Sequence, residues 1–77
     1  MASNEYEHLL RKARDAKHGG IDSWSVQSTG EKVAVALVLN QAAWLESIGY
    51  TLAEAIDRSS SWIEIIPKVA RALADKD

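Results

Sequence analysis

The sequence contains no cysteine and no phenylalanine, and it has a single proline. Without cysteine the chain has neither disulfides nor thiolate ligands for zinc, two common supports of small domains. Folding therefore depends on apolar burial, for which a 47% share of hydrophobic residues is sufficient. The length of 77 residues predicts a single helical domain over residues 1–77. The absence of cysteine is typical of a reducing compartment such as the cytoplasm.

Long apolar runs and an excess of one charge are missing too. The longest apolar run, VAVALVL at residues 33–39, is much shorter than a membrane span. The first residues, MASNEYEHLL, carry acids where a secretory signal has basic residues. The net charge is −2 with both signs interspersed, so no polyanionic or polycationic partner is indicated. We expect a cytoplasmic protein that does not bind membranes.

Four polar residues are each followed three positions later by glutamate, the pattern of a capping box at a helix start. The four pairs are Asn4–Glu7, Ser28–Glu31, Thr51–Glu54 and Ser61–Glu64. Each pair precedes apolar residues that repeat with a helical period. These patterns predict an all-α fold, a compact bundle of four helices at about residues 4–18, 29–48, 52–58 and 62–74.

The predicted second helix is apolar over roughly 240° of its circumference and should therefore lie at the centre. Gly19 and Gly20 are expected to end the first helix, and residues 21–27 to form a connection whose apolar side chains turn inward. Gly49 fits the left-handed position after the second helix. Pro67 should kink the fourth helix or break it. The alternative for residues 33–39 is a buried strand, because the run is rich in β-branched residues.

The most specific functional pattern is that of a helix-turn-helix motif in residues 51–74. The spacing of Ala53, Asp57, Ile63 and Ile66 agrees with it, and the nucleic-acid contacts would come from Arg58, Ser60, Ser61, Lys68 and Arg71. The chemistry fits less well, because Asp57 replaces the usual turn glycine and Glu64 would face phosphates. Residues 51–77 hold four basic and five acidic groups, and nucleic-acid affinity depends on basic ones. A nucleic-acid-binding regulator is therefore the alternative function.

Catalytic and metal-binding patterns are weaker still. His8 and His18 are ten residues apart, and no cysteine or close pair of acids completes a metal site. Both are expected to face solvent. No histidine lies near the serines at 59–61, and no glycine-rich phosphate loop is present. We predict no catalytic residue, no metal and no cofactor, and a protein that is not an enzyme.

A surface for a protein partner, or for a second copy of the chain, has more support. Trp24 and Tyr50 are amphipathic aromatic residues of the kind enriched at interfaces. Trp62 and Ile63 widen the apolar face of the predicted fourth helix. These four residues form the predicted partner surface. The alternative is that the aromatic side chains only cover the core.

The stretch TGEKVAVALVLNQAAWLESIGYTLAEAIDR, followed by Trp62, resembles a group of small uncharacterised bacterial proteins. The positions that carry the resemblance are Gly30-Glu31, Asn40, Trp44-Leu45, Gly49-Tyr50-Thr51 and Trp62. The resemblance implies a bacterial protein with an all-helical fold, and it implies no activity or ligand. The leading interpretation is a small non-enzymatic protein-interaction or regulatory module.

Overall fold

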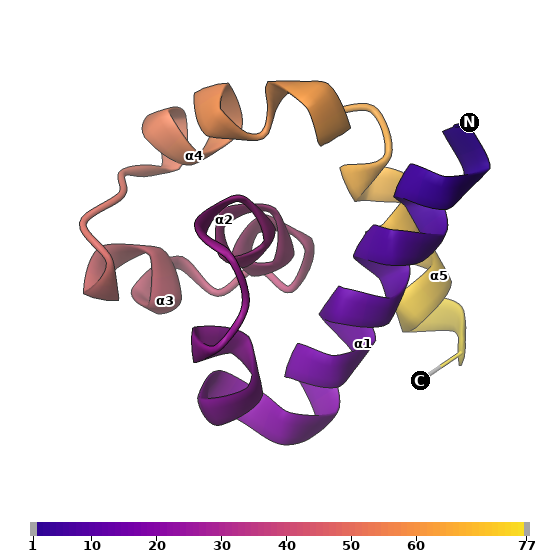
Figure 1. The fold of residues 1–77 in the computed structure, drawn as a ribbon, viewed down its shortest axis with the longest axis horizontal. Coiled ribbons are helices and arrows are strands. Elements are labelled where there is room, and N and C mark those ends of the chain that lie inside the picture. The colour runs from indigo at the N-terminus through magenta and orange to yellow at the C-terminus, as the bar shows by residue number, and fades with distance from the viewer. Residues whose placement is uncertain (1, 77) are drawn as a thin grey trace.

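The computed structural model describes the backbone of residues 2–76 and the burial of side chains in residues 5–74. The described chain is helical with short connections and contains no strand. Its elements are α1 (Ala2–Ser25), α2 (Thr29–Val38), α3 (Ala42–Ser47), α4 (Leu52–Arg58), the 3₁₀ helix η1 (Ser60–Trp62) and α5 (Ile66–Lys76) (Figure 1). The all-α prediction is confirmed, and VAVALVL is helical rather than a strand. The predicted set of four helices is not confirmed, because the described residues form five α-helices.

Helix α2 lies at the centre of the molecule, with the other helices around it (Figure 1). It contacts α1, α3, α4 and α5. Val33, Ala34, Val35 and Ala36 are consecutive residues and all have no exposed surface. A helix that is apolar on nearly every side has to be covered on nearly every side, which explains this central position.

The predicted helix at 29–48 is in fact two helices, because the chain turns at Asn40. The backbone of Asn40 has a left-handed φ of 57°. Its N–H donates to the Leu37 carbonyl at 3.2 Å, and the Gln41 N–H donates to the Ala36 carbonyl at 2.9 Å. This pair of bonds is a Schellman motif, in which asparagine can replace glycine. Apolar residues continue on both sides of the turn, so periodicity alone did not reveal it.

Helix α3 ends with a second Schellman motif, as the sequence predicted. Gly49 has a φ of 80°, and its N–H donates to Glu46 while that of Tyr50 donates to Leu45. Thr51 then begins α4 with a complete capping box, and Ser28 begins α2 in the same way. The capping boxes predicted at Ser28 and Thr51 are therefore both formed.

The sequence predicted that the first helix ends at Gly19 and Gly20, and the helical geometry of α1 is interrupted at Gly20, whose φ of 71° and ψ of −159° are not helical. The predicted connection after it is itself helical, because α1 resumes beyond this kink and continues to Ser25. The helix also begins before Asn4, whose side chain lies outside the described ones. The residues after the kink are held in place by Trp24, whose Nε1–H donates to the Lys32 carbonyl of α2 at 2.8 Å.

The predicted helix at 62–74 begins later, at Ile66, and its predicted kink at Pro67 does not occur inside the helix. Ser61 lies in η1 and does not cap a helix. Pro67 is in the first turn of α5, where a backbone N–H would have no helical partner. The proline therefore favours a helix start at this point and competes with the capping signal at Ser61.

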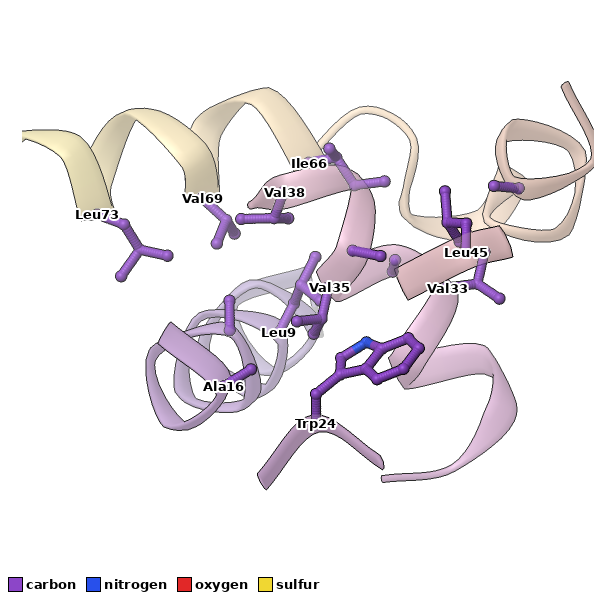
Figure 2. Packing of buried hydrophobic residues seen from close by; sticks show 14 residues of the cluster. Leu9, Ala16, Trp24, Val33, Val35, Val38, Leu45, Ile66, Val69 and Leu73 are labelled. Atoms are coloured by element: carbon purple, nitrogen blue, oxygen red, sulfur yellow. The ribbon is translucent and has the colours of Figure 1, made fainter. Parts of the chain in front are cut away.

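The core forms around α2, and α1, α3, α4 and α5 each contribute buried side chains to it. Figure 2 shows the indole of Trp24 pointing into this cluster, near Val33, Val35 and Leu45. The ring centre of Trp24 lies 5.0 Å from that of Trp44 on α3. From α5 the core receives Ile66, Val69 and Leu73.

Candidate partner-binding surface

Trp24 was predicted to lie on the partner surface, and the structure corrects this. The side chain is only 1% exposed, so a partner has no access to it. The kinked end of α1 turns the indole inward, and its N–H is satisfied by the Lys32 carbonyl. Trp24 is a core residue, as the alternative interpretation held.

Tyr50 lies at the corner between α3 and α4, and it lines two neighbouring clefts. One cleft, of about 300 Å³, is also lined by Leu45, Leu52 and Glu46. The other, of about 320 Å³, is lined by Glu54, Asp57 and Arg58 in addition to Tyr50. Tyr50 itself is half-buried against the core. Its position follows from the Schellman motif at Gly49, which turns the chain between the two helices.

Two aliphatic side chains of α4 are exposed, and one of them, Leu52, shares the first cleft with Tyr50. Leu52 is 55% exposed and Ile56 is 51% exposed. They are four residues apart and therefore neighbours on one side of the helix. Ala55 lies on the same side of α4, but of the three residues only Ala55 is buried. Sequence reasoning therefore missed these two residues as candidates for a partner surface.

The charges around this corner are mostly negative. Residues 42–64 contain four carboxylates, Glu46, Glu54, Asp57 and Glu64, and Arg58 is the only cation in this stretch. Glu46 lines the first cleft, and Glu54 and Asp57 line the second. We define the corner surface as Tyr50, Leu52 and Ile56 with the carboxylates Glu46, Glu54 and Asp57.

Trp62 and Ile63, the other predicted partner residues, line neither of the two clefts. Trp62 is partly buried against the core, and its ring centre is 6.2 Å from that of His8 on α1. Ile63 is 39% exposed and follows η1 directly. The structure therefore brings neither residue together with Tyr50 as a cleft-lining group.

His8 was expected to face solvent but bridges two helices. Its Nε2 lies 2.6 Å from Oε2 of Glu31, which also completes the capping box of α2. Burial by itself raises the pKa of Glu31, but the hydrogen bonds from Ser28 and His8 and the charge of Lys12 together lower that pKa below 4.5. This contact joins residues 23 positions apart, so no local pattern signalled it. It links α1 to the start of α2.

The predicted nucleic-acid contacts are exposed but do not form the expected motif. Ser60 and Ser61 belong to η1, and residues 59–65 separate α4 from α5. A helix-turn-helix motif joins its helices by a turn of three or four residues. Lys68 and Arg71 lie on α5, whereas Arg58 lines the cleft beside Tyr50. The recognition helix expected to begin at Ser61 and Trp62 is not formed.

Two other types of site were sought in the described part of the chain. Among these residues, no three His, Cys, Asp or Glu side chains converge as ligands of a metal ion. Within residues 2–76, no helix combines the length and the apolar character that a membrane span requires.

Comparison with other proteins adds no relative. No protein-family model, curated protein sequence or solved structure matches this chain. The resemblance to a group of small bacterial proteins therefore stays a prediction, and the function has to be argued from the corner surface itself.

Proposed function

We propose that this chain is a small protein-interaction module that binds a basic amphipathic helix of a partner protein at the corner surface. The observation that carries the proposal is the exposure of Leu52 and Ile56 on one side of α4, where Leu52 lines a cleft together with Tyr50 and the carboxylate of Glu46. Recognition of this kind, in which the apolar face of a helix fits into a groove, is common among small helical domains.

The apolar part of the surface supplies affinity. Leu52 and Ile56 are each about half exposed, and covering the exposed half of such a side chain yields about 1 kcal/mol. Tyr50 adds a rigid ring that loses little conformational freedom on binding, which is why tyrosine is frequent at the centre of interfaces. The cleft of about 300 Å³ between Leu45, Tyr50 and Leu52 can receive one apolar side chain of the partner.

The charged part of the surface selects the partner. Glu46 lines the cleft of Leu52 and Tyr50, and Glu54 and Asp57 line the adjoining cleft of Tyr50, so a partner with lysine or arginine beside its apolar stripe is favoured over an acidic one. Because these carboxylates lie at the rim, they should mainly affect the association rate and its dependence on salt.

The test is affinity capture with matched variants. We would immobilise the wild-type chain, the Leu52→Ser/Ile56→Ser double variant and an Ile21→Ser control, and identify bound proteins by quantitative mass spectrometry. Ile21 is 46% exposed and lies on α1, so its replacement removes similar apolar area elsewhere. The expected result is a protein retained by the wild type and by Ile21→Ser and lost from the double variant.

A captured protein supports the proposal only if a basic amphipathic segment of it, made as a peptide, binds the wild-type chain. Fluorescence anisotropy of the labelled peptide should show saturable binding that weakens with salt. A captured protein that binds through an acidic segment would contradict the proposal. Concentration-dependent dimerisation in ultracentrifugation, lost in the double variant, would replace the partner with a second copy of the chain.

A further inference from the structure

His8 joins three elements of the fold through one imidazole ring. The residue lies on α1, its Nε2 is 2.6 Å from Oε2 of Glu31 in the first turn of α2, and its ring centre is 6.2 Å from that of Trp62 in η1. The side chain of His8 is 37% exposed and that of Glu31 is 16% exposed. Solvent therefore reaches the ring, whereas the carboxylate is largely shielded.

The other ring nitrogen of His8 has a partner that determines where the ring carries its proton. Nη2 of Arg11 lies 3.4 Å from Nδ1 of His8. A guanidinium keeps its charge and has only donors, so this contact is a hydrogen bond only when Nδ1 carries no proton. The proton of the neutral ring is then on Nε2, which donates it to Glu31.

These contacts form a continuous series of hydrogen bonds from α1 to the start of α2. Arg11 donates to His8, and His8 donates to Oε2 of Glu31. Oε1 of Glu31 accepts from the Ser28 N–H at 3.1 Å in the capping box. Two cations of α1 face the pair, because Arg11 contacts the ring and the charge of Lys12 acts on Glu31. From η1 the pair receives the uncharged ring of Trp62.

We propose that His8 is a proton-sensitive link between α1 and α2, in which protonation of the ring exchanges its bond with Arg11 for an ion pair with Glu31. A protonated imidazole has a donor on both nitrogens. Its Nδ1–H would face the donors and the positive charge of the guanidinium, so the exposed Arg11 side chain turns away into solvent. The Nε2–H keeps its bond to Glu31, which becomes a charge-assisted one.

The exchange takes place in a range of pH where His8 is the only member of this series that changes its charge. Imidazoles ordinarily titrate between about pH 5 and pH 8. The pKa of Glu31 is lowered below 4.5, so its carboxylate stays charged throughout this range. A guanidinium stays charged as well. Acidification therefore adds a charge to His8 and releases Arg11 while the start of α2 keeps its cap.

Nitrogen NMR of the isotope-labelled chain measures both the tautomer and its titration. At about pH 8 the Nε2 signal of His8 should be that of a protonated nitrogen and the Nδ1 signal that of an unprotonated one. As the pH is lowered to about 5, Nδ1 should gain its proton, and the side-chain signals of Arg11 and Trp62 should move at the same pH. Arg11→Met should raise the midpoint of this titration and Glu31→Gln should lower it, each by about 0.2–0.7 of a pH unit, the effect of one charge near the surface.

The variants are chosen so that the fold is retained. Glutamine can also complete a capping box, so Glu31→Gln keeps the start of α2. Arg11 is exposed, and its replacement removes no core contact. The matched control is Arg14→Met, which removes a cation of the same helix about 9 Å along its axis from His8 and on another side of it. At physiological salt this control should leave the midpoint unchanged.

Three results would overturn the inference. The first is a protonated Nδ1 at about pH 8, because Arg11 would then have no acceptor on the ring. The second is a midpoint in either Arg11→Met or Glu31→Gln that equals that of the Arg14→Met control. The third is a set of Arg11 side-chain signals that stays unchanged while Nδ1 gains its proton. None of these residues belongs to the corner surface, so the result of the capture experiment there does not affect these measurements.

Discussion

Replacing Trp24 with alanine should remove much of the stability of the protein. The side chain is one of the largest that is fully buried, and it contacts Trp44 and donates a hydrogen bond to Lys32. Truncating a buried tryptophan costs about 3–5 kcal/mol, because contacts are lost and a cavity remains. At about 0.05–0.15 kcal/mol per residue, a domain of this length has roughly 4–12 kcal/mol in total. The variant should therefore be partly or wholly unfolded.

A Trp24→Phe variant separates packing from hydrogen bonding. Phenylalanine keeps most of the apolar contact with Trp44 but lacks the N–H that donates to Lys32. We expect a loss of about 1–3 kcal/mol, made up of one hydrogen bond and a small cavity. Urea unfolding followed by circular dichroism measures both variants. If Trp24→Ala lay within about 0.5 kcal/mol of the wild type, as substitutions at the surface do, the core position of Trp24 would be wrong.

Four further predictions follow from individual residues. Thr51→Ala should lower the free energy of unfolding by about 1 kcal/mol in urea titrations, whereas Ser61→Ala should change it by less than about 0.5 kcal/mol, because only Thr51 caps a helix. Asn40→Gly should raise the melting temperature, since glycine adopts a positive φ without strain, and a lower value would contradict the left-handed turn. Folding lowers the pKa of Glu31, so the stability that its carboxylate contributes is present above pH 4.5 and is lost as the pH falls through the folded pKa. The difference in the free energy of unfolding between Glu31→Gln and the wild type, measured at several pH values, should therefore shrink in acid. Mobility shift at moderate salt should show no tight binding of duplex DNA, and submicromolar binding lost in Arg58→Ala would overturn the charge argument.

The sequence predicted those features that depend on adjacent residues. The capping boxes at Ser28 and Thr51 and the glycine turn at Gly49 each involve a few neighbouring residues, and all three are formed. Ser61 carries the same signal without capping a helix, because Pro67 favours a start at Ile66 instead. Where two local signals lie within one or two turns of each other, the pattern alone does not decide between them.

Contacts between distant residues account for most of what sequence reasoning missed. The bond from Trp24 to Lys32 and the pair His8–Glu31 join α1 to α2, and neither pair has a spacing that a single helix would produce. Sequence reasoning missed the corner surface for the same reason. Its clefts exist because the turn at Gly49 brings α3 and α4 together around Tyr50, so their position could be read only from the folded chain.

The exposure of Leu52 and Ile56 has a cause in the packing of α4. This helix contacts α2 and α3, and the residue that it buries is Ala55, which has no exposed surface. A small residue at a contact lets two helices approach closely, and a larger one there would force side chains out of their preferred rotamers. Close approach through Ala55 brings only a narrow part of α4 into the core, and the flanking aliphatic side chains stay outside. Single exposed aliphatic residues are common on proteins, but here two lie next to each other and one of them, Leu52, lines a cleft with Tyr50 and Glu46. The same close packing that positions α4 thus leaves its apolar side chains accessible to a partner.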